Sequence, residues 1–137
     1  MQLSRKSDYA LRAVMHLAGL PKDQLASIGT IAEAQSIPRE FLAKILKDLT
    51  WAGILSSFQG VTGGYKLARP AKSISFQNVI EAMDGPVRLN LCVKNDKNNK
   101  HYKNCGMRDF WLKEQAHFVK ALSGANFAKY KTAFKKK

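Results

Sequence analysis

The segment that decides the fold is GILSSFQGVTGGYKLARP, residues 53–70. Two short, partly apolar runs, 54–58 and 65–68, suit β-strands. The loop between them, 59–64, contains three glycines, which permit positive backbone dihedral angles. Because the pattern that comes before residue 53 is helical, the segment predicts a β-hairpin attached directly to the end of a helix.

Three helical patterns precede this hairpin. Apolar spacing predicts a first helix of about four turns, capped at its N-terminus by Ser4 or Ser7. A short second helix should follow Ser27 and end near residues 35–36. The third should begin at Pro38, since proline is tolerated in the first helical turn. Its apolar stripe comprises Phe41, Leu42, Ile45, Leu46 and Leu49.

Two helices joined by a short turn, the second of them amphipathic, describe a helix-turn-helix, and the hairpin makes it a winged helix. The third helix is expected to face a DNA major groove and its phosphates, and the hairpin to lie along the phosphate backbone. The alternative is a hairpin that only covers the core. The expected DNA contacts are Arg39, Glu40, Lys44, Lys47, Gln59 and Lys66.

The charge of the chain points to a polyanionic partner. Its 137 residues suit one domain, and 23 Lys and Arg against 10 Asp and Glu give a formal net charge of +13. Nucleic acid is the leading class of partner for such an excess. Residues 90–137 hold 12 of the 23 cations, so a general basic nucleic-acid-binding protein that uses its lysine tail, 135–137, is the alternative function.

Other function classes find little support. We see no catalytic constellation and no phosphate-cradling loop, so we do not expect an enzyme. No apolar run approaches the ~18 to 20 residues of a membrane helix. Polar residues interrupt the apolar N-terminal stretch at helical spacing, unlike in a signal peptide. We therefore expect a soluble cytoplasmic protein with no membrane partner.

The second half of the chain predicts a helix, a loop and another helix. Ser75 can cap a helix that stops at residues 84–86, and the polar run 93–104 should form an exposed loop. An aromatic-rich helix is expected over 108–122. Since it has little core to join, burial against a second copy is expected, giving a homodimer for a pseudo-palindromic double-stranded DNA site.

Three stretches resemble the Rrf2 family of bacterial transcription regulators, and the likeness covers residues 1–92. The stretches are SDYALRAVMHLA (7–18), TIAEAQSIPREFLAKILKDLTWAGIL (30–55) and GVTGGYKLARPAKSISFQNVIEAMDGP (60–86). The resemblance implies a mainly α fold with a small β-hairpin: a winged helix-turn-helix and a long C-terminal dimerisation helix. The expected parts are a DNA-binding domain over 1–89, a cysteine-flanked sensing loop over 90–106, and a dimerisation helix with a basic tail over 107–137.

The sequence departs from the family at several positions that concern DNA. The family often has glycine in the helix-turn-helix turn, where this chain has Ser36, and arginine at the tip of the wing, where it has Gln59. An arginine there could enter a narrow minor groove, whereas glutamine carries no charge. The wing is therefore expected to contact DNA less strongly. At the front of the third helix, Arg39, Glu40, Ala43 and Lys44 replace the more usual small, polar or acidic mixture of the family, so we expect a different operator, with repression as the mode of regulation.

Two cysteines, Cys92 and Cys105, flank the polar loop. The resemblance implies three cysteines in cluster-binding relatives, with a fourth ligand that is a histidine or an acidic residue from the first helix of the partner subunit. The middle cysteine is missing here, and His101 and Asp8 could complete a set for an iron–sulfur cluster, [2Fe–2S] rather than [4Fe–4S]. With such a cluster, the protein would sense redox state, nitric oxide or iron–sulfur status. The alternatives are reversible thiol chemistry of Cys92 and Cys105, and no redox role for either cysteine.

Overall fold

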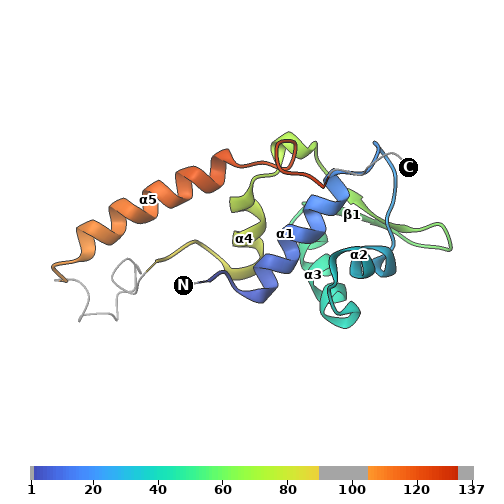
Figure 1. Ribbon diagram of the computed structural model, residues 1–137, viewed down its shortest axis with the longest axis horizontal. Coiled ribbons are helices and arrows are strands. Elements are labelled where there is room, and N and C mark those ends of the chain that lie inside the picture. The colour runs from blue at the N-terminus through green and yellow to red at the C-terminus, as the bar shows by residue number, and fades with distance from the viewer. Residues whose placement is uncertain (1, 90–104, 133–137) are drawn as a thin grey trace.

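The computed structural model describes residues 2–89 and 105–132. Its elements are α1 (Arg5–Ala18), α2 (Ile28–Gln35), α3 (Arg39–Trp51), β1 (Leu55–Phe58), β2 (Gly64–Leu67), the short 3₁₀ helix η1 (Ala71–Ser73), α4 (Phe76–Asp84) and α5 (Arg108–Gly124) (Figure 1). The fold is mainly helical with one hairpin and a long C-terminal helix, which confirms the expected winged helix-turn-helix. Within the described residues, no helix is long and apolar enough to cross a membrane.

Serine caps fix where three of the helices begin. The Ser4 hydroxyl accepts a hydrogen bond from the Ser7 N–H at 3.0 Å, so Ser4 caps α1. Ser27 caps α2 in the same way. In α4 the Ser75 hydroxyl accepts from the Asn78 N–H, and the Asn78 side chain accepts from the Ser75 N–H. Such caps stabilise a helix by about 1 kcal/mol each, which explains why the sequence located these helix starts correctly.

The turn between α2 and α3 carries a strained residue. Ser36 adopts the left-handed conformation, with φ 53° and ψ 46°. This conformation costs on the order of 1 kcal/mol for a residue with a Cβ. The next residue, Ile37, is 4% exposed, and its N–H donates to the Ala32 carbonyl at 3.0 Å. Burial of Ile37 therefore helps to hold the turn that sets the direction of α3.

The hairpin is tied to the body of the protein along one edge. β1 and β2 pair antiparallel, with Leu55 opposite Leu67. The other edge of β2 meets the loop before α2, because Tyr65 and Ala26 exchange two backbone hydrogen bonds of 2.8 and 3.1 Å. Gly64 stands at φ +156°, and a Cβ there would lie 2.6 Å from the Ala26 carbonyl oxygen. Only glycine lets the two backbones approach this closely.

The chain after α5 returns to the core, which the sequence analysis did not anticipate. Phe127 is 1% exposed, and its N–H donates to the Ile74 carbonyl at 3.3 Å. The Phe76 N–H donates to the Ala125 carbonyl at 2.9 Å, and the Thr132 N–H reaches α1 at the Met15 carbonyl, 3.1 Å away. Residues 125–132 thus pack against α1 and α4. Two aromatic residues three positions apart in a short stretch, Phe127 and Tyr130, produce no extended periodic signal, so the sequence did not reveal this packing.

Helix α5 lies apart from the hairpin and from α2 and α3. It packs against α4 and extends away from the body of the protein (Figure 1). Leu122 is its one buried residue, while Met107, Phe110 and Phe118 are 57%, 58% and 38% exposed. At 3.6 residues per turn these three side chains fall on one face of the helix. The sequence predicted an aromatic-rich helix here, and its burial against a second copy stays a prediction.

Because His16 is buried, we expect the free energy of unfolding of the protein to decrease at acidic pH. The His16 imidazole, in α1, is 3% exposed, with Nδ1 3.4 Å from the Gln35 amide nitrogen. Burial lowers the pKa of His16 from 6.5, so the unfolded chain takes up the proton first as pH falls. The free energy of unfolding should therefore be constant above pH 6.5 and decrease below it. Urea denaturation between pH 8 and 5 should show this, and His16→Gln should reduce the dependence.

The matched control for that experiment is His117→Gln, because the His117 side chain is 62% exposed on α5. This variant should keep the pH dependence of the wild type. If wild type and His16→Gln lost stability equally between pH 6.5 and 5, His16 would not be the group responsible.

Candidate nucleic-acid interface

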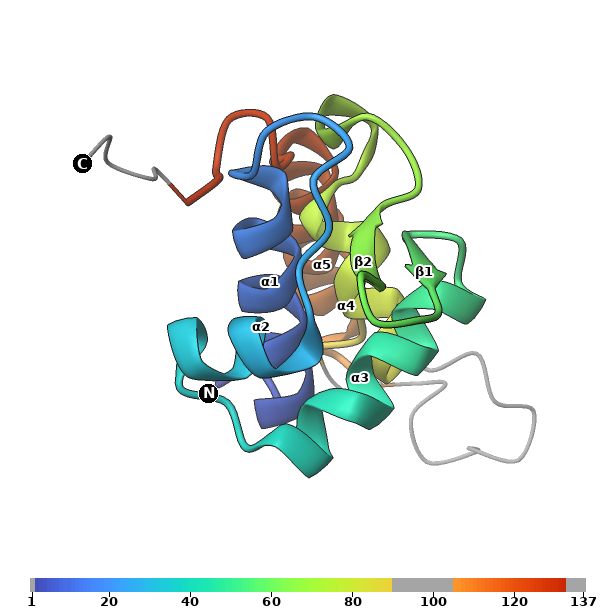
Figure 2. The ribbon, with the colours of Figure 1, turned by 90° about the vertical axis from the view of Figure 1, so that its right-hand side faces the viewer.

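One face of α3 is buried and the opposite face carries charge. Leu42, Ile45, Leu46 and Leu49 are at most 1% exposed and pack into the core. The predicted contacts on the other face, Arg39, Glu40, Lys44 and Lys47, are all exposed. Figure 2 shows α3 and the hairpin on the same side of the protein, with α5 behind them. The helix can therefore enter a major groove while the hairpin contacts the flanking backbone.

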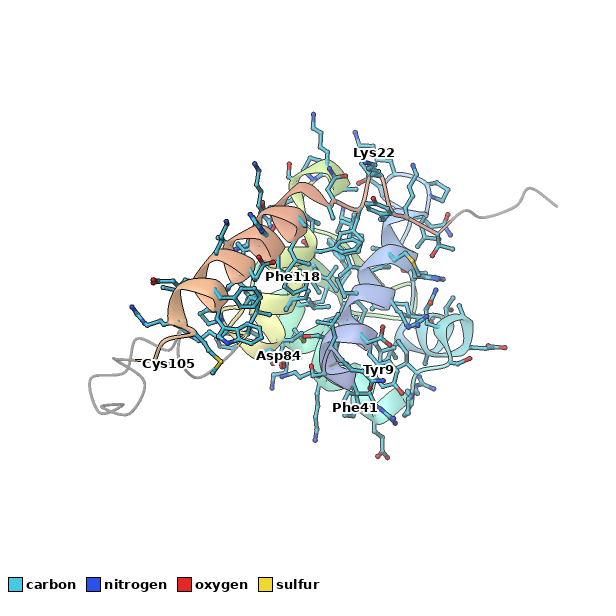
Figure 3. All side chains as sticks on the ribbon, turned by 60° about the vertical axis from the view of Figure 1, so that its left-hand side comes forward. Tyr9, Lys22, Phe41, Asp84, Cys105 and Phe118 are labelled. Carbon is cyan, nitrogen blue, oxygen red and sulfur yellow. The ribbon has the colours of Figure 1, made fainter. Side chains whose placement is uncertain are left out.

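Helix α1 fixes the position of α3 through two contacts. The Lys6 Nζ lies 3.0 Å from Asp48 Oδ2, and the rings of Tyr9 and Phe41 meet edge-to-face with centroids 5.5 Å apart. Tyr9 and Phe41 are neighbours in Figure 3. The ion pair also balances the one acidic side chain in the last turns of α3, which leaves the cations of the exposed face dominant. Neither contact was predicted from the sequence, because each joins residues of two different helices.

A second contact of α1 joins it to the end of α4. The hydroxyls of Ser4 and Ser7 both donate to Asp84 Oδ2, at 2.6 Å each. Ser7 is completely buried, so this bond satisfies a hydroxyl that has no access to water. No local pattern signals the contact, because its partners lie 77 and 80 residues apart in the chain.

The hairpin, with its 59–63 turn, is the wing, and its tip is a tight turn. The Gly63 N–H donates to the Gly60 carbonyl at 3.0 Å, and a Cβ at Gly63 would collide with the carbonyl oxygen of Phe58. The predicted contact Gln59 is exposed, as is Val61, which stands fully in solvent. Sequence reasoning did not single out Val61, although an apolar residue between turn glycines was the available signal.

The other predicted wing contact, Lys66, already has partners. Its Nζ lies 3.0 Å from Asp23 Oδ1 and 5.3 Å from the centre of the Phe58 ring. The hydrogen bond and the charge of Lys66 lower the pKa of the Asp23 carboxyl. Lys66 is therefore held at the base of the wing, and its charge is partly balanced before any DNA approaches.

The four candidate cluster ligands are only partly described. Cys92 and His101 lie outside the described residues. Asp8 lies in the first turn of α1, where its carboxylate accepts from Arg12 Nε at 3.1 Å, and Cys105 is partly buried just before α5. Figure 3 places Cys105 well away from Tyr9, the neighbour of Asp8. Within residues 2–89 and 105–132, no group of three His, Cys, Asp or Glu residues could hold a metal.

Comparison with known proteins identifies the family. The model of the family described as Rrf2, iron-dependent transcriptional regulator, matches residues 3–131. The chain belongs to the Rrf2 family. A relative from Mycobacterium tuberculosis strain H37Rv, named as the HTH-type transcriptional regulator Rv1287, is 39% identical over 87 residues, 64% of this chain and 54% of the relative. This Rrf2 protein thus spans about half the length of that relative.

Solved structures share the fold. The global cysteine regulator CymR of B. subtilis superposes with a TM-score of 0.77 at 22% identity, covering 93% of this chain and 94% of CymR. The IscR of T. potens gives a TM-score of 0.75 at 23% identity, covering 93% and 84%. These two likenesses show the fold alone. The function comes from the family: Rrf2 proteins are DNA-binding transcriptional regulators and not enzymes, as the sequence predicted.

Proposed function

We propose that this Rrf2 protein is a homodimeric repressor that recognises a pseudo-palindromic operator through α3. The observation that carries the proposal is the exposed face of α3, which carries Lys44 and Lys47 and begins at the exposed residue Arg39; α3 and the wing lie on the same side of the protein (Figure 2). Cations can bind phosphates or guanine edges, and Glu40 can accept from cytosine. Dimerisation through α5 is supported by the apolar side chains of Met107, Phe110 and Phe118, which are 57%, 58% and 38% exposed in one protomer.

A charge-removing change on α3 tests the proposal. Lys44→Gln should relax discrimination between operator and mutated operator by ~1 to 3 kcal/mol for each base that Lys44 reads. Affinities of wild type and variant for a panel of single-base operator changes give the result. The control is Lys120→Gln, since Lys120 is exposed on α5, away from the wing. If Lys44→Gln weakened every DNA sequence alike, the general nucleic-acid-binding alternative would be favoured.

For sensing, we propose a [2Fe–2S] cluster held by Cys92, Cys105 and His101 with Asp8 of the partner subunit. Figure 3 shows Cys105 far from Tyr9, the residue that follows Asp8, and for this reason the proposal takes Asp8 from the partner subunit. Thiolate, imidazole and carboxylate form a donor set that suits iron. A cluster can regulate only if it favours one arrangement of the dimer over another.

Anaerobic purification tests the sensing proposal. We expect coloured protein with stoichiometric iron and sulfide, and loss of both in Cys92→Ala and Cys105→Ala. Asp8→Ala should make the cluster more labile, whereas Asp109→Ala, a change at an exposed acidic residue of α5, should not. Colourless protein whose operator affinity changes on thiol oxidation would favour reversible thiol chemistry. Colourless protein with unchanged affinity would leave a regulator without a redox role.

A further inference from the structure

Arg39, the first residue of α3, extends its side chain across the turn onto the first turn of α2. Its Cζ and Nη2 lie 3.7 Å, and its Nη1 3.8 Å, from the point where a Cβ of Gly29 would stand. Because the three atoms are nearly equidistant from that point, the guanidinium group lies face-on over Gly29. The side chain therefore does not project from the exposed face of α3 in the way that its neighbours Lys44 and Lys47 can.

The position on α2 indicates which part of DNA this guanidinium can reach. In a helix-turn-helix, the first helix crosses the sugar–phosphate backbone, and the second lies in the major groove. A guanidinium group held on α2 therefore faces the backbone and not the base edges. Arg39 is exposed, and no ion pair joins it to a carboxylate within the described part of the chain. Its donors remain available for the bidentate contact that Arg makes with phosphate.

Because Gly29 has no side chain, it leaves room for the guanidinium group of Arg39. Glycine is a poor residue for a helix, and the three atoms nearest to a Cβ at this position all belong to Arg39. A methyl group 3.7 Å away would make an ordinary contact, so alanine should leave Arg39 where it is. A longer side chain at position 29 would occupy the space of the guanidinium group and displace it.

We propose that Arg39 is a phosphate contact that does not read base sequence, and that Gly29 is its positioning residue. The proposal rests on the proposed function, since it assumes that α2 and α3 dock on DNA as a helix-turn-helix. Sequence discrimination then falls to Glu40, Lys44 and Lys47 on the exposed face of α3.

The test compares Arg39→Gln, Gly29→Gln and Gly29→Ala with the wild type. Each is titrated against the operator selected by the wild type and against a scrambled duplex of equal length, at several salt concentrations. Arg39→Gln should weaken both affinities by the same factor, about tenfold or more. The slope of log affinity against log salt should fall by about 0.9 for each phosphate that the variant no longer binds. Gly29→Gln should reproduce both effects, and Gly29→Ala should show neither.

Two controls keep the result interpretable. Thermal melting should show that all three variants are folded, and the double variant Gly29→Gln/Arg39→Gln should lose no more affinity than Arg39→Gln alone, because both changes remove one contact. An Arg39→Gln protein that relaxed the preference at one base pair, or that bound DNA as well as the wild type, would overturn the inference. A wild type that selected no operator would overturn the proposed function, and the inference with it.

Discussion

Replacing Phe110 and Phe118 by glutamate should convert the proposed dimer to a monomer of 15.3 kDa. Both side chains are exposed in one protomer and, with Met107, line one face of α5. Glutamates there would place charges in an interface that dimerisation must desolvate. A monomer engages one half-site at a time, so operator affinity should fall by a factor on the order of 10² to 10⁴. Sedimentation equilibrium and operator titration measure the two effects.

The control for this variant is Lys113→Glu, which changes the formal charge by the same two units. Lys113 is exposed on α5 but lies outside the apolar face. It should leave the protein dimeric, with only the modest reduction of DNA affinity that lower net charge causes. If the double glutamate variant still sedimented as a dimer, the interface would have to lie elsewhere on the protein.

The second large effect concerns the C-terminal segment. Phe127→Ala should lower the free energy of unfolding by about 3 to 5 kcal/mol, the usual cost of removing a buried phenylalanine side chain. The Phe127 ring is buried, and its centroid lies 5.0 Å from that of Phe76. Its removal leaves a cavity between η1, α4 and the chain that follows α5. Urea denaturation of the two proteins gives the difference.

Tyr130→Ala is the matched control for Phe127→Ala. Tyr130 also lies beside Phe76, with ring centroids 5.4 Å apart, but it is 48% exposed. Its removal should cost much less, because most of the cavity would be open to water. Equal decreases in the two variants would contradict the conclusion that the segment over 125–132 belongs to the core.

The sequence predicted the elements whose signals are local. Apolar periodicity and serine caps located α1 to α4, and the glycine-rich stretch located the hairpin to within one residue of its strands. The same periodicity identified the exposed basic face of α3. These features depend on residues that are neighbours in the chain, so they can be read without knowing the fold.

The features that the sequence did not reveal join distant residues. Asp84 holds Ser4 and Ser7, Lys66 pairs with Asp23, and Phe127 enters the core from a polar stretch. None of these contacts leaves a pattern in the chain, since each forms only when the helices have packed. The sequence likewise identified Arg39 as a DNA contact without indicating that its side chain lies over Gly29.

The central claim, that two copies recognise one operator through α3, is tested most directly by selecting binding sites from a random pool of duplex DNA. We expect a motif made of two inverted half-sites, with centres about one helical turn of DNA or a multiple of it apart. The Phe110→Glu/Phe118→Glu protein should fail to enrich the paired motif. Selection by the wild type that enriched no sequence, or a single half-site without its inverted copy, would contradict the account.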